Sequence, residues 1–329
     1  MSQVSDNRME SILPHTMNIV GEPLTRVETM LRSQLQSEVP IIDEMVNCGG
    51  ATGGKRFRPI LLLLAAQATG GIEDQHIMLA TSVEMIHAAT LVHDDIIDNA
   101  KTRRHVTTIN NRWGNQGAVL FGDFLFTQAF YLASLTGSAE ACQIIGRATN
   151  LVCEGELQQS DAAGNFETTV DEYYEIISKK TAALCACATE LGASFCGDPA
   201  SVKKWKQVGM DLGLAFQIVD DVLDLKGDAT ACGKTLGTDL ETAKPTLPIL
   251  LGLQMTGVNE RAKWLNRLNR RELSRDEVTR WLNETGAMQA AEKLAEQKVQ
   301  SSVEFTRTQN SNVAAAFQEL SEFLLARNN

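Results

Sequence analysis

Two stretches of the chain each place three aspartates at the same spacing among apolar residues. The first is LVHDDIID at residues 91–98, and the second is QIVDDVLD at residues 217–224. On a helix, at about 100° per residue, the aspartates of one D-D-x-x-D motif share a single face. Like charges four residues apart repel one another, and the cost grows when neighbouring Ile, Val and Leu exclude water. A fold that contains both motifs must bring positive charge to both.

A divalent cation held between the motifs would supply that charge. The candidate ligands are Asp94, Asp95, Asp98, Asp220, Asp221 and Asp224. Oxygen-only ligation favours a hard ion, and Mg²⁺ fits best because it takes few carboxylates and completes its shell with water and phosphate oxygens. One such motif alone is more typical of a solvated acidic face. Two copies favour a metal site, whereas a purely structural helical bundle would leave both clusters unexplained.

Basic residues gather at glycine-rich breaks and helix ends. They are Lys55, Arg56, Arg58, Arg103, Arg104, Lys180, Lys234 and Lys244. Glycines precede Lys55 and Lys234, which suits backbone that approaches a phosphate closely, and arginines can hold oxyanions through two hydrogen bonds. The pattern predicts one diphosphate held through metal and a second held mainly by cations. His87 lies on the same helical face as Asp94 and is either a substrate contact or an interior histidine.

Bulk properties limit the partners and the compartment. The net charge of −11 argues against a general nucleic-acid or anionic-membrane surface. Seven cysteines without a C-x-x-C pair favour a reducing compartment. No basic region leads into an apolar segment near Met1, and the longest apolar run, 60–66, is too short to span a membrane. We therefore expect a cytoplasmic protein with no transmembrane segment.

The periodicity predicts an all-α protein. Tyr and Pro are few, and Ala, Leu, Glu and Gln recur at spacings of three and four. The predicted helices cover 24–48, 57–70, 75–100, 104–114, 116–136, 138–162, 170–196, 201–226 and 245–257, with two or three more toward the C-terminus. No low-complexity linker or repeat divides the chain.

Seven motifs in order resemble the trans-isoprenyl diphosphate synthases, the polyprenyl synthetase family. They are GGKRFRP, HAATLVHDDIIDNAKTRR, GDFLF, EGELQQ, KKTAAL, FQIVDDVLD and GKTLGTDLETAKPTLP, within about residues 50–250. The resemblance implies a single all-α domain over 1–329, with helices around a central cavity and the aspartate motifs facing across its mouth. It also implies a homodimer.

The resemblance further assigns roles to individual residues. The six aspartates would bind Mg²⁺ that bridges to an allylic diphosphate. That allylic site would be completed by Arg103, Lys180, Thr181, Gln217, Lys234 and Lys244. The diphosphate of isopentenyl diphosphate would be bound by Lys55, Arg58, His87 and Arg104. The implied catalytic residues are Asp94, Asp95, Asp98, Arg103, Lys180, Asp220, Asp221 and Lys234. Phe216 would line the pocket or serve the core.

Product length depends on residues just upstream of the first motif. Ile86, Ala89 and Thr90 would line the cavity wall one to two turns below Asp94. In the family, large aromatic residues four or five positions before Asp94 stop chain growth, and the small Thr90 and Ala89 at these two positions favour a long-chain all-trans product. Alternatives are a short-chain farnesyl or geranylgeranyl diphosphate synthase, a terpene cyclase and a non-catalytic subunit.

Two positions depart from the family pattern. His105 and Ala243 stand where the family commonly has glycine, which would alter loop geometry without removing a ligand.

Overall fold

The structure is a computed structural model that describes residues 13–48, 54–103, 106–196, 198–227 and 237–326. Its described residues are almost entirely helical, as predicted. The N-terminal half contains α2 (Pro14–Gln34), α3 (Pro40–Asn47), α4 (Phe57–Thr69), α5 (Asp74–Ile97), the strands β1 (Thr102–Arg103) and β2 (Val106–Thr107), α6 (Ile109–Ser134) and α7 (Ala139–Ala162).

The second half continues the helical pattern. It contains α8 (Val170–Ile177), the π-helix η1 (Ser178–Ala182), α9 (Ala183–Ser194), α10 (Pro199–Lys226), α12 (Thr238–Glu241), α13 (Leu247–Met255), α14 (Val258–Asn269), α15 (Arg275–Glu284), α16 (Ala287–Thr306) and α17 (Ser311–Ala326). The strands form one antiparallel pair, with Thr102 opposite Thr107.

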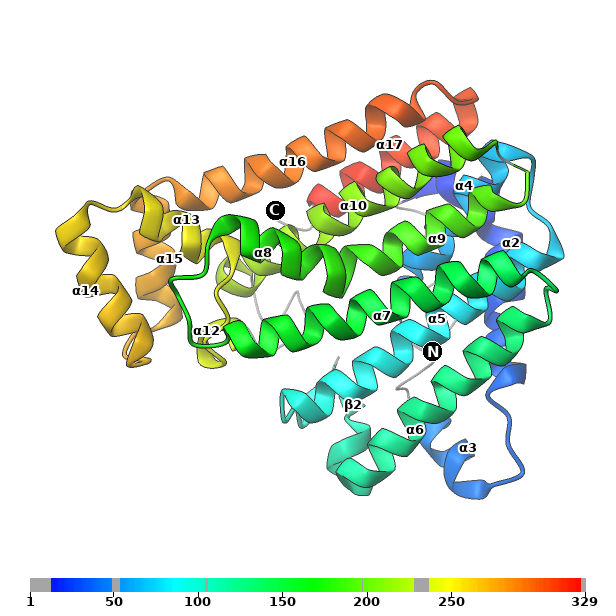
Figure 1. Cartoon of the computed structure of the whole chain (residues 1–329), viewed down its shortest axis with the longest axis horizontal. Coiled ribbons are helices and arrows are strands. Elements are labelled where there is room, and N and C mark those ends of the chain that lie inside the picture. Colours follow the sequence, from blue (N-terminus) through cyan, green and yellow to red (C-terminus); the bar gives the residue numbers. More distant parts are fainter. Residues whose placement is uncertain (1–12, 49–53, 104–105, 197, 228–236, 327–329) are drawn as a thin grey trace.

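The long helices run across the molecule roughly side by side (Figure 1). α5, which carries the first aspartate motif, packs against α6, α4 and α2, whereas α10, which carries the second, packs against α9, α16 and η1. α14 and α15 lie at the left end of the view (Figure 1). At the other end of the chain order, Glu319 of α17 accepts a hydrogen bond from the Thr16 amide of α2 at 2.8 Å. The first and last described helices therefore pack together.

Two glycines allow the π-helix to lie very close to its neighbours. A Cβ added at Gly155 of α7 would lie 2.3 Å from the Lys180 backbone nitrogen, and one added at Gly213 of α10 would lie 2.5 Å from Ala182 Cα. Larger side chains would push η1 away, because such distances are far inside van der Waals contact. These glycines thus set how closely η1, and with it Lys180, lies to α7 and α10.

Two boundary predictions were wrong. The helix expected over 24–48 is two helices, because Pro40 begins α3 at its first turn and Val39 before it is extended. Of the helix expected over 104–114, Val106–Thr107 is strand β2, and the part from Ile109 joins the helix expected over 116–136 in one element, α6, which bends at Gly114 with φ of 78°. The segment predicted as helix over 170–196 is α8, η1 and α9 in succession.

Among the described helices, α6 is long and apolar enough to cross a membrane by length and composition, with 39% of its test window buried. Core helices of water-soluble proteins pass the same test. The expected lack of a transmembrane segment stays a prediction.

Candidate functional site

The first aspartate motif lies at the C-terminal end of α5. Asp95 is 6% exposed, and Arg103 of β1 approaches it with Nε and Nη2, each 2.8 Å from Oδ1. Burial raises the pKa of Asp94 to about 6; nearby Lys180 opposes the shift, while Glu156 and Asp98 add to it. A carboxyl with such a pKa lacks full compensation for its charge, so this end of α5 attracts a cation.

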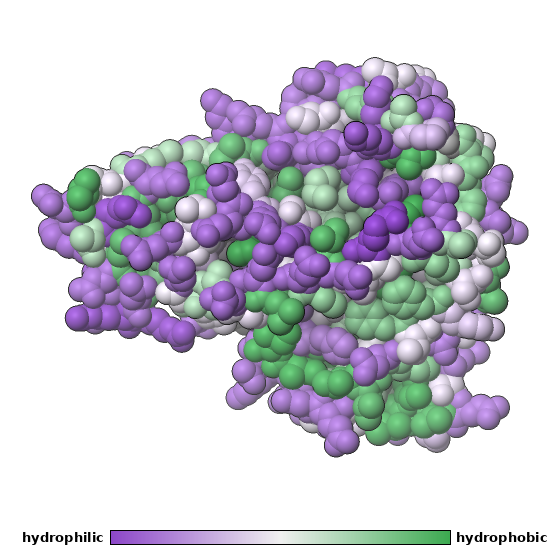
Figure 2. All heavy atoms as spheres, in the orientation of Figure 1, coloured by the Kyte–Doolittle hydropathy of each residue, from purple (hydrophilic) through white to green (hydrophobic). Residues whose placement is uncertain are grey.

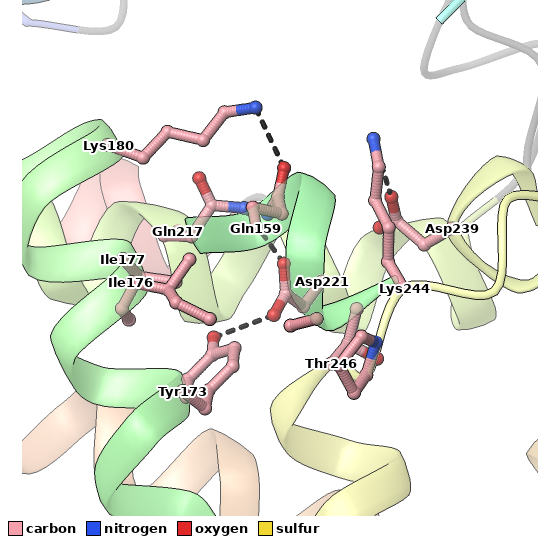
Figure 3. Close-up of a pocket in the computed structure, with 12 residues that line it drawn as sticks. Gln159, Tyr173, Ile176, Ile177, Lys180, Gln217, Asp221, Asp239, Lys244 and Thr246 are labelled. Carbon is pink, nitrogen blue, oxygen red and sulfur yellow. Dashed lines mark hydrogen bonds and ion pairs between the residues drawn. The ribbon is translucent and has the colours of Figure 1, made fainter. Parts of the chain in front are cut away.

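The second motif is held by hydrogen bonds that converge on Asp221. Its Oδ2 accepts from the Tyr173 hydroxyl at 2.6 Å, and its Oδ1 accepts from Gln217 Nε2 at 2.8 Å (Figure 3). Gln217 Oε1 in turn accepts from the Thr181 hydroxyl at 2.7 Å. Burial, together with the charge of Asp239, raises the pKa of Asp221 to about 8. The hydrogen bonds orient this side chain between α8, η1 and α10.

Asp224 supports the backbone that follows the motif. Its Oδ1 accepts from the amides of Gly237 at 3.1 Å and Thr238 at 3.3 Å and from the Thr238 hydroxyl at 3.1 Å. Its Oδ2 accepts from the Asp239 amide at 3.1 Å. Carboxylates at a helix start satisfy backbone donors that have no intrahelical partner. Asp224 therefore fixes the start of α12, and with it the position of Asp239.

Lys244 connects the first motif to Asp239, whose backbone is held by Asp224 of the second motif. Its Nζ lies 3.2 Å from Asp98 at the end of α5 and 3.8 Å from Asp239 of α12. Burial lowers the pKa of Lys244, but the charges of Asp239 and Asp98 outweigh it and raise the pKa overall. Burial raises the pKa of Asp239 to about 6, with contributions from Asp224, Asp98 and Asp220. Carboxylates from both motifs thus influence the same groups.

Lys180 and Lys244 lie on opposite sides of one cavity (Figure 3). Lys180 forms an ion pair with Glu156 of α7 and donates to Gln159 Oε1 at 2.8 Å. The cavity has a volume of about 130 Å³ and is polar on one side (Figure 3). Its lining residues are Gln159, Ala162, Tyr173, Ile176, Ile177, Lys180, Gln217, Asp221, Asp239, Lys244, Pro245 and Thr246.

Of the residues expected to bind the second diphosphate, Lys55 lies just before α4, Arg58 lies on α4 and His87 lies on α5. Lys55 is exposed, with Nζ 4.8 Å from the centre of the Phe323 ring of α17. Arg58 is 8% exposed, and its buried Nε has no hydrogen-bond partner within the described chain. His87 lies on α5, two turns before Asp94. The Phe57 ring stacks on Phe216 of α10 with centroids 5.4 Å apart, so the start of α4 adjoins the helix of the second motif.

The predicted chain-length residues lie on α5 below the first motif. Ile86 and Ala89 are fully buried. Thr90 is half-buried, and its hydroxyl donates to the His87 carbonyl at 2.8 Å.

Some predictions concern residues outside the described ranges, namely Arg104, Lys234 and His105. Ala243 is described, and it has φ of 55°, in the left-handed region that favours glycine. Its carbonyl accepts from the Gly164 amide at 2.8 Å. The backbone here keeps the conformation that a glycine would adopt without strain, so this departure changes the energy of the loop more than its path.

Several site residues were not predicted from the sequence. Glu156 and Gln159 lie within the EGELQQ motif, and Asp239 lies within GTDLETAKP, so motif context could have found them. Tyr173 and Phe323 carry no comparable signal, because each reaches the site through packing between distant helices.

The residues present fit Mg²⁺ only if water and substrate supply part of its ligands. Within the described ranges, no three acidic, His or Cys side chains form a ready cluster for a metal ion. Mg²⁺ does not require one, because it binds through one or two carboxylates and takes its remaining ligands from water and substrate. The candidate ligand atoms are carboxylate oxygens, and burial raises the pKa of Asp94, Asp221 and Asp239. Each would gain from a nearby cation.

The fold and this site define a class of protein: an all-α enzyme whose cavity is lined by Asp221, Asp239, Lys180 and Lys244, with Lys244 also in contact with Asp98 of the first motif. This combination of carboxylates and cations suits phosphorylated substrates and divalent metal. The polyprenyl synthetase family model matches residues 39–285, and the chain belongs to this family. It is a trans-prenyltransferase. The predicted family and all-α fold are thereby confirmed.

Two of the similar proteins are named for long-chain products. The chain is 36% identical to octaprenyl diphosphate synthase of Haemophilus influenzae over 285 residues, which cover 85% of this chain and 86% of that protein. It is 38% identical to a geranyl-diphosphate-specific all-trans-nonaprenyl-diphosphate synthase of Rhodobacter capsulatus over 243 residues, covering 74% and 75%. The crystal structure of a Caulobacter crescentus CB15 polyprenyl synthase with calcium and isoprenyl diphosphate has a TM-score of 0.90 and 33% identity, covering 96% and 98%.

Replacing Asp94 by asparagine should stabilise the metal-free protein in a pH-dependent way. Because burial raises the folded-state pKa from 3.8 to about 6, the stability that this group contributes is present below the lower value and is lost as the pH rises through the higher one. In EDTA, Asp94→Asn should increase the free energy of unfolding by about 1–3 kcal/mol at pH 8 and by much less at pH 4. Urea unfolding followed by circular dichroism measures both values.

The matched control is Asp161→Asn at the end of α7, which removes one exposed carboxylate. Equal effects of Asp94→Asn at the two pH values would contradict the assigned burial.

Proposed function

We propose that the chain condenses isopentenyl diphosphate head-to-tail with an allylic diphosphate in a Mg²⁺-dependent reaction, giving a long-chain all-trans polyprenyl diphosphate. The observation that carries the proposal is the position of Lys244 between Asp98 of the first motif and Asp239, because Asp224 of the second motif holds the backbone of Asp239. Names of the relatives, octaprenyl and nonaprenyl diphosphate synthase, support the long-chain class.

Mg²⁺, when bound, would offset the negative charge that develops on the departing diphosphate. We propose that Asp94, Asp95, Asp98, Asp220, Asp221 and Asp224 form its acidic surroundings. The hydrogen bonds to Asp221 and Asp224 support a positioning contribution from these two.

The chain's own cations complete the allylic site. Lys180 and Lys244 lie on opposite sides of the cavity (Figure 3). Arg103 lies beside Asp95. These preorganised charges favour breaking of the allylic C–O bond because they stabilise the diphosphate that leaves. The isopentenyl double bond then forms the new C–C bond, and loss of a proton gives the longer chain. Gln217 holds Asp221, and Thr181 holds Gln217. By family resemblance we assign Lys234 to this allylic site and Arg104 to the site for isopentenyl diphosphate.

The isopentenyl diphosphate would lie at the start of α4. Lys55, Arg58 and His87 are proposed to hold its diphosphate, and the buried Arg58 Nε supports this because a charged donor there calls for an acceptor. The stacked Phe57 and Phe216 rings lie between α4 and α10, where the two substrates would meet.

We also propose a homodimer in the cytoplasm, with α6 and α7 at the interface. Large apolar side chains of these helices face solvent, including Leu120 at 61% and Leu157 at 71% exposed. Hydrophobic surface gathers over α6 in the lower part of Figure 2. Monomers rarely expose contiguous apolar patches of this kind.

The described cysteines are free thiols, which suits a reducing compartment. The continuous hydrophobic core supports a single domain.

The direct test is to incubate the purified protein with Mg²⁺, labelled isopentenyl diphosphate and allylic primers of several lengths. Chromatography of the dephosphorylated products should show all-trans chains longer than geranylgeranyl. Failure to elongate every primer would contradict the enzymatic proposal, and products no longer than geranylgeranyl would favour the short-chain alternative.

Ala89→Phe should shorten the product by several isoprene units. Ala89 is fully buried on α5, about one turn below Asp94, so an aromatic ring there would block the path of the growing chain. Product length is measured by the same chromatography.

Ala88→Phe is the matched control for this variant, since it places the same ring on the next residue of α5, at 5% exposure. Its products should keep their length. Unchanged product length in Ala89→Phe would refute the proposed floor.

Leu120→Glu should convert the dimer into a monomer, because a carboxylate in an apolar interface loses its hydration without gaining a partner. Light scattering coupled to size-exclusion chromatography measures the mass. Val258→Glu, at an equally apolar residue that is 85% exposed on α14, should leave the dimer intact. A dimeric Leu120→Glu protein would argue against this interface.

A further inference from the structure

Arg56 lies at the centre of a buried ion cluster beneath the start of α4. Its side chain is 5% exposed. Nε and Nη2 both donate to Glu28 of α2, the latter at 3.2 Å, and Nη1 donates to Glu84 of α5 at 2.8 Å. One guanidinium therefore connects three elements that are far apart in the sequence.

The backbone of Arg56 has an unusual conformation. With φ of 49° and ψ of 35°, it lies in the left-handed region immediately before α4. Non-glycine residues adopt this region at an energetic cost. Glycine would adopt it freely but has no side chain to reach Glu28 and Glu84. This position thus combines a strained turn with a buried charge, and strained residues persist where surrounding contacts fix them.

The electrostatics keep the cluster charged. Burial alone lowers the pKa of Arg56, but the charges and hydrogen bonds of Glu84 and Glu28 outweigh burial and raise it overall. Glu84 is 5% exposed, so removal of the guanidinium would leave its carboxylate buried without this partner. A flexible lysine places one ammonium and cannot reproduce the forked contacts to two carboxylates.

The cluster adjoins every described residue proposed to hold isopentenyl diphosphate. Lys55 precedes Arg56 directly, Arg58 follows two residues later, and His87 lies one helical turn after Glu84 on α5. Arg56 points inward to the two carboxylates, whereas Lys55 next to it is exposed. The cluster therefore sets the distance between the α4 cations and His87.

We propose that Arg56, with Glu84 and Glu28, is a positioning group that sets affinity for isopentenyl diphosphate. This inference rests on the proposed function. The allylic cations Arg103, Lys180 and Lys244 pair instead with Asp95, Glu156, Asp98 and Asp239. Loss of the cluster should consequently affect the two substrates differently: the affinity for isopentenyl diphosphate falls, and the affinity for the allylic substrate does not.

The test compares Arg56→Lys with wild type in steady-state elongation. KM for isopentenyl diphosphate should rise about tenfold, while KM for the allylic diphosphate and kcat stay within about threefold. Glu84→Gln, which keeps the size of the side chain, should shift the same constant in the same direction. Calorimetry with isopentenyl diphosphate alone should show the matching loss of affinity for both variants.

The matched control is Arg26→Lys. Arg26 also joins α2 to α5, through Asp74, but this ion pair is exposed and includes no residue of α4. Its kinetic constants should equal those of wild type. If Arg56→Lys does not fold, Glu84→Gln decides the matter by the same measurements.

The possible failures are distinguishable. Equal rises in both KM values, or no change in either, would overturn the positioning role while wild type still elongates chains. A wild-type protein that elongates nothing would instead defeat the proposed function.

Discussion

Mutual repulsion among partly buried carboxylates is the constraint on which this site depends. Burial raises the pKa of Asp94, Asp221 and Asp239, so the fold gathers acids where water only partly stabilises them. The surrounding elements are arranged to offset that cost: Lys180 projects from a π-turn and Lys244 from the segment after α12. The close packing at Gly155 follows from the same need, because η1 must lie against α7 for Lys180 to reach Glu156.

The sequence was sufficient to predict the fold class and the placement of both motifs on helices. Helical periodicity and turn residues determine secondary structure over a few neighbouring positions, and tertiary packing did not change the outcome for these helices. The boundary errors arose where one residue overrode the pattern, as Pro40 and Gly114 did. The π-helix was also missed, because it depends on the fit of η1 between α7 and α10 and not on composition.

The finer geometry of the site could be predicted only in part. Family resemblance placed Lys180, Gln217 and Lys244 in one group, and they do line one cavity. It did not indicate that Tyr173 would hold Asp221 or that Phe323 would underlie Lys55. Both contacts join helices far apart in sequence, and local periodicity carries no information on which distant side chain meets which. Lys234 and Arg104 lie outside the described residues, so their placement stays a prediction.

The hydrogen bonds of Asp224 give the second motif two separate tasks. Its oxygens serve four donors at the start of α12, as a capping residue does. The three aspartates of the second motif are therefore not three equivalent candidate ligands, since Asp224 mainly holds the backbone at the start of α12. The number of aspartates in a motif does not give the number of metal ligands that the motif supplies. In a chain of this kind, an aspartate can be indispensable to a metal site because it builds the turn that carries its neighbours.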